Sequence, residues 1–143
     1  MEEWKKYSKE GKDYLKAAFG AYSNKKLGNS VIYNLIGLSI ESYLTALCMK
    51  LNILPEHSSI GSMLHLLKKH LEVPESFTAE SRFMNRFMNF CSLDVCDVKE
   101  PGNSDLVRML NFMGNIRDFA EENTAFNQQK IEMQGTINID INL

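Results

Sequence analysis

Apolar residues recur three and four positions apart over most of this chain, which is the pattern of amphipathic α-helices. The pattern is strongest over residues 29–52, where one broad apolar face contains Ile32, Leu35, Ile36, Ile40, Tyr43, Leu44, Leu47, Cys48 and Leu51. A face this wide predicts the central helix of a bundle. The same spacing predicts further helices over residues 2–23, 58–71, 78–92 and 104–123.

Turn residues separate these segments. Pro55 lacks an amide hydrogen and restricts the residue before it, so it ends the apolar helix. Ser58 or Ser59 is suited to cap the next helix, and the pair Pro101-Gly102 predicts a loop before the last one. Short connections favour antiparallel neighbours. We therefore expect an all-α domain over residues 1–126, an up-and-down bundle of four to five helices.

The C-terminal residues follow a different period. Apolar residues alternate with polar ones at Ile131, Met133, Ile137, Ile139, Ile141 and Leu143, with an interruption at Gly135. Period two predicts a strand, so residues 127–143 are interpreted as a short, extended, β-like tail. This tail could fold back near Gly135, remain disordered, or pair with a second subunit through Ile137, Ile139 and Ile141.

A tandem tetrapeptide, Arg82-Phe83-Met84-Asn85 followed by Arg86-Phe87-Met88-Asn89, lies in the fourth predicted helix. Residues four apart on a helix stack along its axis. Phe83 and Phe87 are thus expected to form one ridge, and Met84 and Met88 the next. Large side chains of this kind serve either as core or as a subunit interface.

Composition restricts the class of protein without identifying it. The 143 residues are 44% hydrophobic and 24% charged, as in one globular domain, and the net charge of −2 gives no overall attraction to nucleic acid or anionic lipid. Residues 1–26 hold seven lysines against four acids, which indicates a solvated helix face or a weak nucleic-acid patch. No leader segment or membrane-length apolar run is evident, so we expect a cytoplasmic protein without a membrane partner.

Chemical motifs are few. The sequence has no Gly-rich phosphate loop, no His-Glu-x-x-His and no acidic cluster with metal spacing, so it predicts neither a cofactor nor a metal. Of the three cysteines, Cys48 falls on an apolar helix face and is interpreted as a core residue. His57 precedes the third predicted helix, where its side chain is expected to cap the helix start or to be exposed to solvent; the alternative is a role in binding a ligand.

The central residues resemble the HEPN domains of prokaryotic toxin–antitoxin and nucleotidyltransferase systems. The resemblance is carried by Glu41-Ser42-Tyr43-Leu44-Thr45-Ala46-Leu47, then Pro55-Glu56-His57, then Met63-Leu64-His65-Leu66-Leu67. It covers residues 30–71 and implies a helical bundle that dimerises. It also implies binding roles for Glu41 and His57, and a nucleotidyltransferase-type protein, a nucleotide or RNA as the partner.

Ribonuclease members of that family carry an arginine followed after four to six residues by a histidine. Arg117 lies where such an arginine is expected, with Asp118 and Glu121 beside it, but no histidine follows His70 in this chain. General acid–base catalysis near neutral pH favours an imidazole. We therefore expect a non-catalytic, homodimeric binding module that uses Arg117, Asp118 and Glu121. The alternatives are a metal-independent ribonuclease with a degenerate site at Arg117, and a structural helical assembly protein.

Overall fold

The described part of the chain is entirely helical. The computed structural model describes the backbone of residues 2–88 and 100–141, and the side chains of these residues up to position 125. Within these residues there are five helices: α1 (Glu3–Asn24), α2 (Asn29–Lys50), α3 (Ile60–Leu67), α4 (Glu75–Asn85) and α5 (Asn103–Ile141). The predicted all-α class is confirmed.

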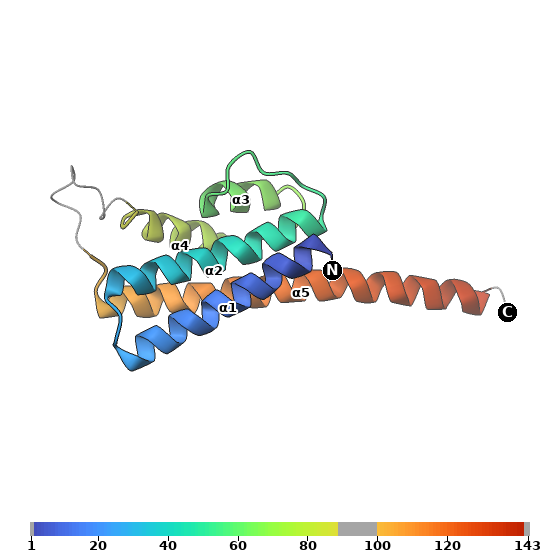
Figure 1. Ribbon diagram of the computed structural model, residues 1–143. Helices are drawn as coiled ribbons and strands as arrows, with labels where there is room; N and C mark the ends of the chain where they lie inside the picture. The colour runs from blue at the N-terminus through green and yellow to red at the C-terminus, as the bar shows by residue number, and fades with distance from the viewer. Residues whose placement is uncertain (1, 89–99, 142–143) are drawn as a thin grey trace.

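The longer helices run up and down (Figure 1). α1 and α4 point one way, whereas α2 and α5 point the other, and the short α3 lies over the end of α2. α2 packs against both α1 and α5. It is therefore the central helix, as the width of its apolar face predicts.

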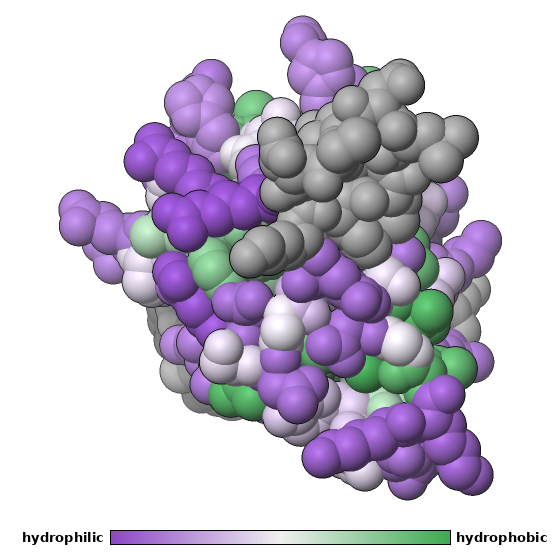
Figure 2. All heavy atoms as spheres, turned by 90° about the vertical axis from the view of Figure 1, so that its left-hand side faces the viewer, coloured by the Kyte–Doolittle hydropathy of each residue, from purple (hydrophilic) through white to green (hydrophobic). Residues whose placement is uncertain are grey.

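The core forms where α1, α2 and α5 meet. Its largest fully buried side chains include Tyr43, Ile36, Ile40, Leu44, Phe112, Met109 and Met113. Phe77 attaches α4 to this core, since its ring meets the rings of Phe112 and Phe119 edge-on at centroid distances of 5.6 and 5.5 Å. Cys48 is fully buried, as predicted, and burial raises the pKa of its thiol. At the left-hand end of Figure 1, hydrophilic side chains predominate and hydrophobic ones form small separate areas (Figure 2).

Polar contacts fix the helix starts. The Ser59 hydroxyl accepts a hydrogen bond from the Ser62 amide at 3.2 Å, which makes Ser59 the N-cap of α3. The first turn of α2 is held from a distance: the Ser30 amide donates to a carboxylate oxygen of Glu100 at 2.9 Å, and the Asn29 amide group donates to the Pro101 carbonyl at 2.8 Å. These bonds join the start of α2 to the loop before α5.

α4 begins earlier and ends earlier than the predicted helix over 78–92. It starts at Glu75 after Pro74, whose φ of −55° fits a helix start, and an acid in the first turn is favourable there. The helix ends at Asn85, so Arg86, Phe87 and Met88 of the second tetrapeptide follow its last turn. The Phe83 and Phe87 rings still meet edge-on at 5.5 Å, which confirms the predicted contact between them.

The predicted β-like tail is not observed. The backbone of residues 127–141 continues α5, which extends past the rest of the bundle (Figure 1). A helix satisfies its own amide and carbonyl groups, whereas a lone strand needs a partner for them. Helical hydrogen bonding therefore overrides the period-two pattern here. Ile137, Ile139 and Ile141 lie on this part of α5, and their side chains are outside the described residues.

α2 has the length and apolar composition of a membrane-spanning helix, although the sequence analysis identified no apolar run of that length. By length and composition alone, Asn29–Lys50 is apolar enough to cross a membrane, and it is the one such helix among the described residues. Half of its most apolar 18-residue stretch is buried inside the bundle. The core helix of a globular domain has the same composition.

Candidate functional site

The three site residues predicted on α5 lie within two turns of one another. The Arg117 guanidinium donates from Nε to Oδ1 of Asp118 at 2.9 Å. This hydrogen bond is the main reason that the pKa of Arg117 is raised, and the charges of Asp118 and Glu121 act in the same direction. The Arg117 side chain is 35% exposed, and that of Asp118 is 66% exposed. The arginine is therefore a paired cation at the edge of the bundle.

A buried tyrosine hydroxyl lies behind this cluster. Tyr43 is 1% exposed, and its hydroxyl has no hydrogen-bond partner among the described residues. The pKa of Tyr43 is raised to about 12, chiefly by burial; the charges of Glu121, Asp118 and Asp13 also raise it, whereas that of Arg117 lowers it. The three carboxylates near Tyr43 outnumber the one guanidinium, that of Arg117, so the cluster has a net negative charge. Such a cluster is poorly suited to a phosphate group.

The sequence placed Tyr43 on the apolar face of a helix and within the motif that resembles the HEPN family, but it did not indicate a site role for this residue. Its ring packs against the backbone of Gly11 in α1, where the nearby Ser39 hydroxyl also donates to the Gly11 carbonyl at 2.8 Å. The glycine in the apolar stripe of α1 was the only sequence signal for the close approach, and no pattern identified the unpaired hydroxyl.

Glu41 lies away from Arg117. Residues two apart on a helix point in nearly opposite directions, so Glu41 turns away from the side of α2 that carries Tyr43. Burial raises the pKa of the Glu41 carboxyl, and within the described residues no nearby charge contributes to this shift. The structure therefore does not join Glu41 to the α5 cluster, although the family resemblance suggested both as binding residues.

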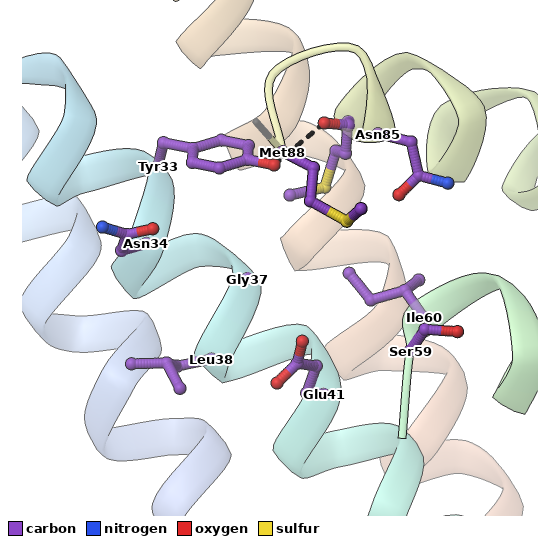
Figure 3. A pocket seen from close by; sticks show the side chains of 10 residues that line it. Tyr33, Asn34, Gly37, Leu38, Glu41, Ser59, Ile60, Asn85 and Met88 are labelled. Carbon is purple, nitrogen blue, oxygen red and sulfur yellow. Dashed lines mark hydrogen bonds between the residues drawn. The ribbon is translucent and has the colours of Figure 1, made fainter. Parts of the chain in front are cut away.

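Glu41 instead lines an open groove, which we call the α2–α4 groove (Figure 3). It has a volume of about 330 Å³ and is lined by Tyr33, Asn34, Gly37, Leu38, Glu41, Ser59, Ile60, Met84, Asn85 and Met88. One wall is α2, and the other is the start of α3 with the end of α4 and the turn after it. The Tyr33 hydroxyl spans the two sides by donating to the Met84 carbonyl at 2.9 Å.

The four residues predicted to form interface ridges differ in their burial. Phe83 and Met84 are buried, Phe87 is partly buried against the core, and Met88 is 63% exposed. Phe83 also lies beneath the guanidinium of Arg108, 3.8 Å from the ring centroid, and Arg108 forms two hydrogen bonds to Glu80 of α4. Of these four residues, only Met88 offers a substantial surface to another molecule.

His57 belongs to a third location. It lines an open pocket of about 530 Å³ beside α3, together with His65, Lys69 and the strongly exposed Leu54. The predicted binding residues thus fall in three separate places: the α5 cluster, the α2–α4 groove and this pocket. Among the described residues, no group of three or more histidine, cysteine or acidic side chains is arranged to hold a metal ion.

Comparisons with known protein families, with curated proteins and with solved structures gave no match.

Proposed function

We propose that this chain is a non-catalytic, HEPN-like binding module. In this proposal it acts in the cytoplasm as a homodimer, within a toxin–antitoxin or related system that includes a nucleotidyltransferase-type or RNA-linked partner. The main support for the absence of catalysis in this proposal is the pairing of Arg117. Arg117, on which the ribonuclease alternative depends, is paired with Asp118 at 2.9 Å and faces further acids. A guanidinium in this setting is held by its own chain and is poorly placed to stabilise a phosphate.

The distribution of imidazoles supports the same conclusion. All three histidines lie in or next to α3, at positions 57, 65 and 70, and the chain has none after His70. Metal-independent cleavage of RNA needs groups that move protons at neutral pH, and imidazole is the side chain best suited to that. The Arg117 cluster contains carboxylates and a buried phenol instead.

The test is RNA cleavage by the purified chain with EDTA present to exclude contaminating metal-dependent nucleases. Wild type, Arg117→Ala and Arg82→Ala would be compared, since Arg82 is an exposed arginine on α4 that belongs to none of the candidate sites. We expect no cleavage by any of the three proteins. Cleavage by wild type and Arg82→Ala that Arg117→Ala loses would show a ribonuclease and overturn the proposal.

A structural assembly role is the second candidate, and the exposure of Met88 favours it. A methionine that is 63% exposed beside an apolar groove is a surface that another subunit could cover. Sedimentation of the wild-type chain over a range of concentrations tests the homodimer in both proposals. A monomer at every concentration would exclude both homodimerisation and self-assembly.

A further inference from the structure

The α2–α4 groove contains a carboxylate that has no partner within the described part of the chain. Glu41 is partly buried, and among the described residues its side chain forms neither a hydrogen bond nor an ion pair. In Figure 3 the carboxylate projects from α2 into the groove, on the side opposite Met88 and Ile60. Removing a carboxylate from water without pairing it is unfavourable. This position therefore favours the arrival of a cation.

The walls around this carboxylate are apolar and adaptable. Leu38 is 41% exposed and Met88 is 63% exposed, so both offer surface to a bound group. Met84 and Ile60 add to the apolar lining of the groove. Methionine side chains change rotamer easily and adapt to varied apolar partners. A group that suits these walls has an aliphatic part as well as a positive charge.

Size and charge narrow the occupant further. A groove of about 330 Å³ lies at the lower end of the range for small-molecule sites, which runs from about 300 to 1,000 Å³. That space fits one long side chain with its immediate neighbours. A nucleotide or RNA phosphate would meet the negative charge of Glu41, which no cation among the residues the structure describes compensates.

We propose that the α2–α4 groove receives a lysine or arginine side chain from an apolar segment of a partner protein. The aliphatic stem packs along Leu38 and Met88, and the positive charge pairs with Glu41. Long basic side chains characteristically bury their stems while their charged ends find a polar partner. This assignment rests on the proposed binding function and names the chemistry of the protein partner.

The test uses two short peptides and backbone NMR of the isotope-labelled full chain. The basic probe is acetyl-Leu-Lys-Leu-amide, and its neutral match is acetyl-Leu-Gln-Leu-amide. We expect the basic peptide to shift amide signals around Leu38, Glu41 and Asn85, and the neutral peptide to bind at least about fivefold more weakly. An equal response to the two peptides would show that the groove selects apolar surface alone and would overturn the proposal.

Variants locate the interaction. Glu41→Gln keeps the shape of the side chain and removes its charge, so it should weaken the basic peptide about tenfold. Glu72→Gln removes an exposed acid after α3 and should change nothing. Met88→Ala, at an exposed site, should weaken both peptides without affecting the fold. Equal binding to Glu41→Gln and wild type, shifts that map elsewhere, or no binding at millimolar peptide would each contradict the assignment.

Two further outcomes separate this inference from the broader proposal. If Glu41→Gln instead abolishes self-association in sedimentation, the occupant is a second copy of this chain and the partner assignment is wrong. Peptide binding does not depend on the RNA-cleavage result, which reports on Arg117 in a different part of the molecule. A failed peptide test with no RNA cleavage would thus remove the groove assignment and leave the non-catalytic reading in place.

Discussion

The ring of Tyr43 in α2 lies directly against the backbone of Gly11 in α1. A Cβ atom at position 11 would be 2.8 Å from Cδ2 of Tyr43, which is closer than real side-chain contacts allow. The ring cannot retreat easily, because Tyr43 is 1% exposed in a close-packed core. Glycine at this position therefore sets the distance between the two helices.

Gly11→Ala should consequently lower the free energy of unfolding by about 1–3 kcal/mol, since it overpacks the contact between α1 and α2. Gly20 offers a matched control on the same helix, because nothing lies within 4 Å of a Cβ built there. Gly20→Ala should raise stability by about 0.5–1 kcal/mol through helix propensity. Urea denaturation of both variants measures the difference, and a Gly11→Ala protein as stable as Gly20→Ala would contradict the close contact.

The hydroxyl of Tyr43 predicts a second effect. It is buried without a hydrogen-bond partner among the described residues, so Tyr43→Phe should stabilise the protein at neutral pH by about 1 kcal/mol. A loss of stability at pH 7 would show that the hydroxyl has a partner, such as a bound water molecule.

The same variant changes the pH dependence of stability. Burial and nearby carboxylates raise the pKa of Tyr43 from 10.0 to about 12, so above pH 10 the unfolded chain releases this proton while the folded chain keeps it. The free energy of unfolding of wild type should therefore fall, relative to Tyr43→Phe, between pH 10 and about 12. Parallel stability curves for the two proteins in this range would contradict the raised pKa, and the other tyrosines cancel in the comparison.

Much of the fold could be predicted from the sequence because local signals are strong in helices. The period of the apolar residues located α1 and α2 closely, and Ser59 was correctly among the two predicted caps of α3. α4 was misplaced because Pro74 was taken as part of a break, although proline is well suited to the start of a helix. The period-two tail was misread because the pattern describes side chains, whereas the backbone hydrogen bonds decide the conformation.

The candidate sites were less predictable for a physical reason. Sequence spacing joined Arg117 to Asp118 and Glu121, since neighbours on one helix remain neighbours in the fold. It could not show that Tyr43 packs behind them, or that Glu41 faces Met88 across a groove. Those relationships depend on how separate helices pack. The family resemblance suggested binding roles for Glu41, His57 and Arg117 without placing them relative to one another, and the structure distributes them over three locations.

The link between Glu100 and the start of α2 leads to another prediction. The Glu100 carboxylate accepts from the Ser30 amide at 2.9 Å and thereby caps a helix that lies 70 residues earlier in the chain. Glu100→Ala should lower the free energy of unfolding by about 0.5–1 kcal/mol, as the loss of a helix cap does. Glu100→Gln keeps a carbonyl acceptor and should lose less. Equal losses in the two variants, measured by thermal unfolding, would assign the effect to something other than this hydrogen bond.

Phe87 and Met88 are adjacent in the chain but differ in burial, so charged variants at the two positions should have different effects. Phe87 is partly buried and its ring meets those of Phe83 and Tyr33 at centroid distances of 5.5 and 6.3 Å. A charge there would be placed among aromatic side chains, so Phe87→Glu should lower the free energy of unfolding by about 2 kcal/mol or more. Met88 is 63% exposed, and Met88→Glu should leave stability within about 0.5 kcal/mol of wild type.

The two variants together test whether this surface joins subunits. If the α2–α4 groove lies in a subunit interface, Met88→Glu should remain folded by circular dichroism and sediment as a monomer under conditions where wild type is a dimer. A charge buried in an interface without a partner weakens association strongly. A folded Met88→Glu protein that still dimerises would place the interface elsewhere on the bundle and leave the groove open to a protein partner. Phe87→Glu alone could not decide this, because the loss of a dimer there would follow from unfolding.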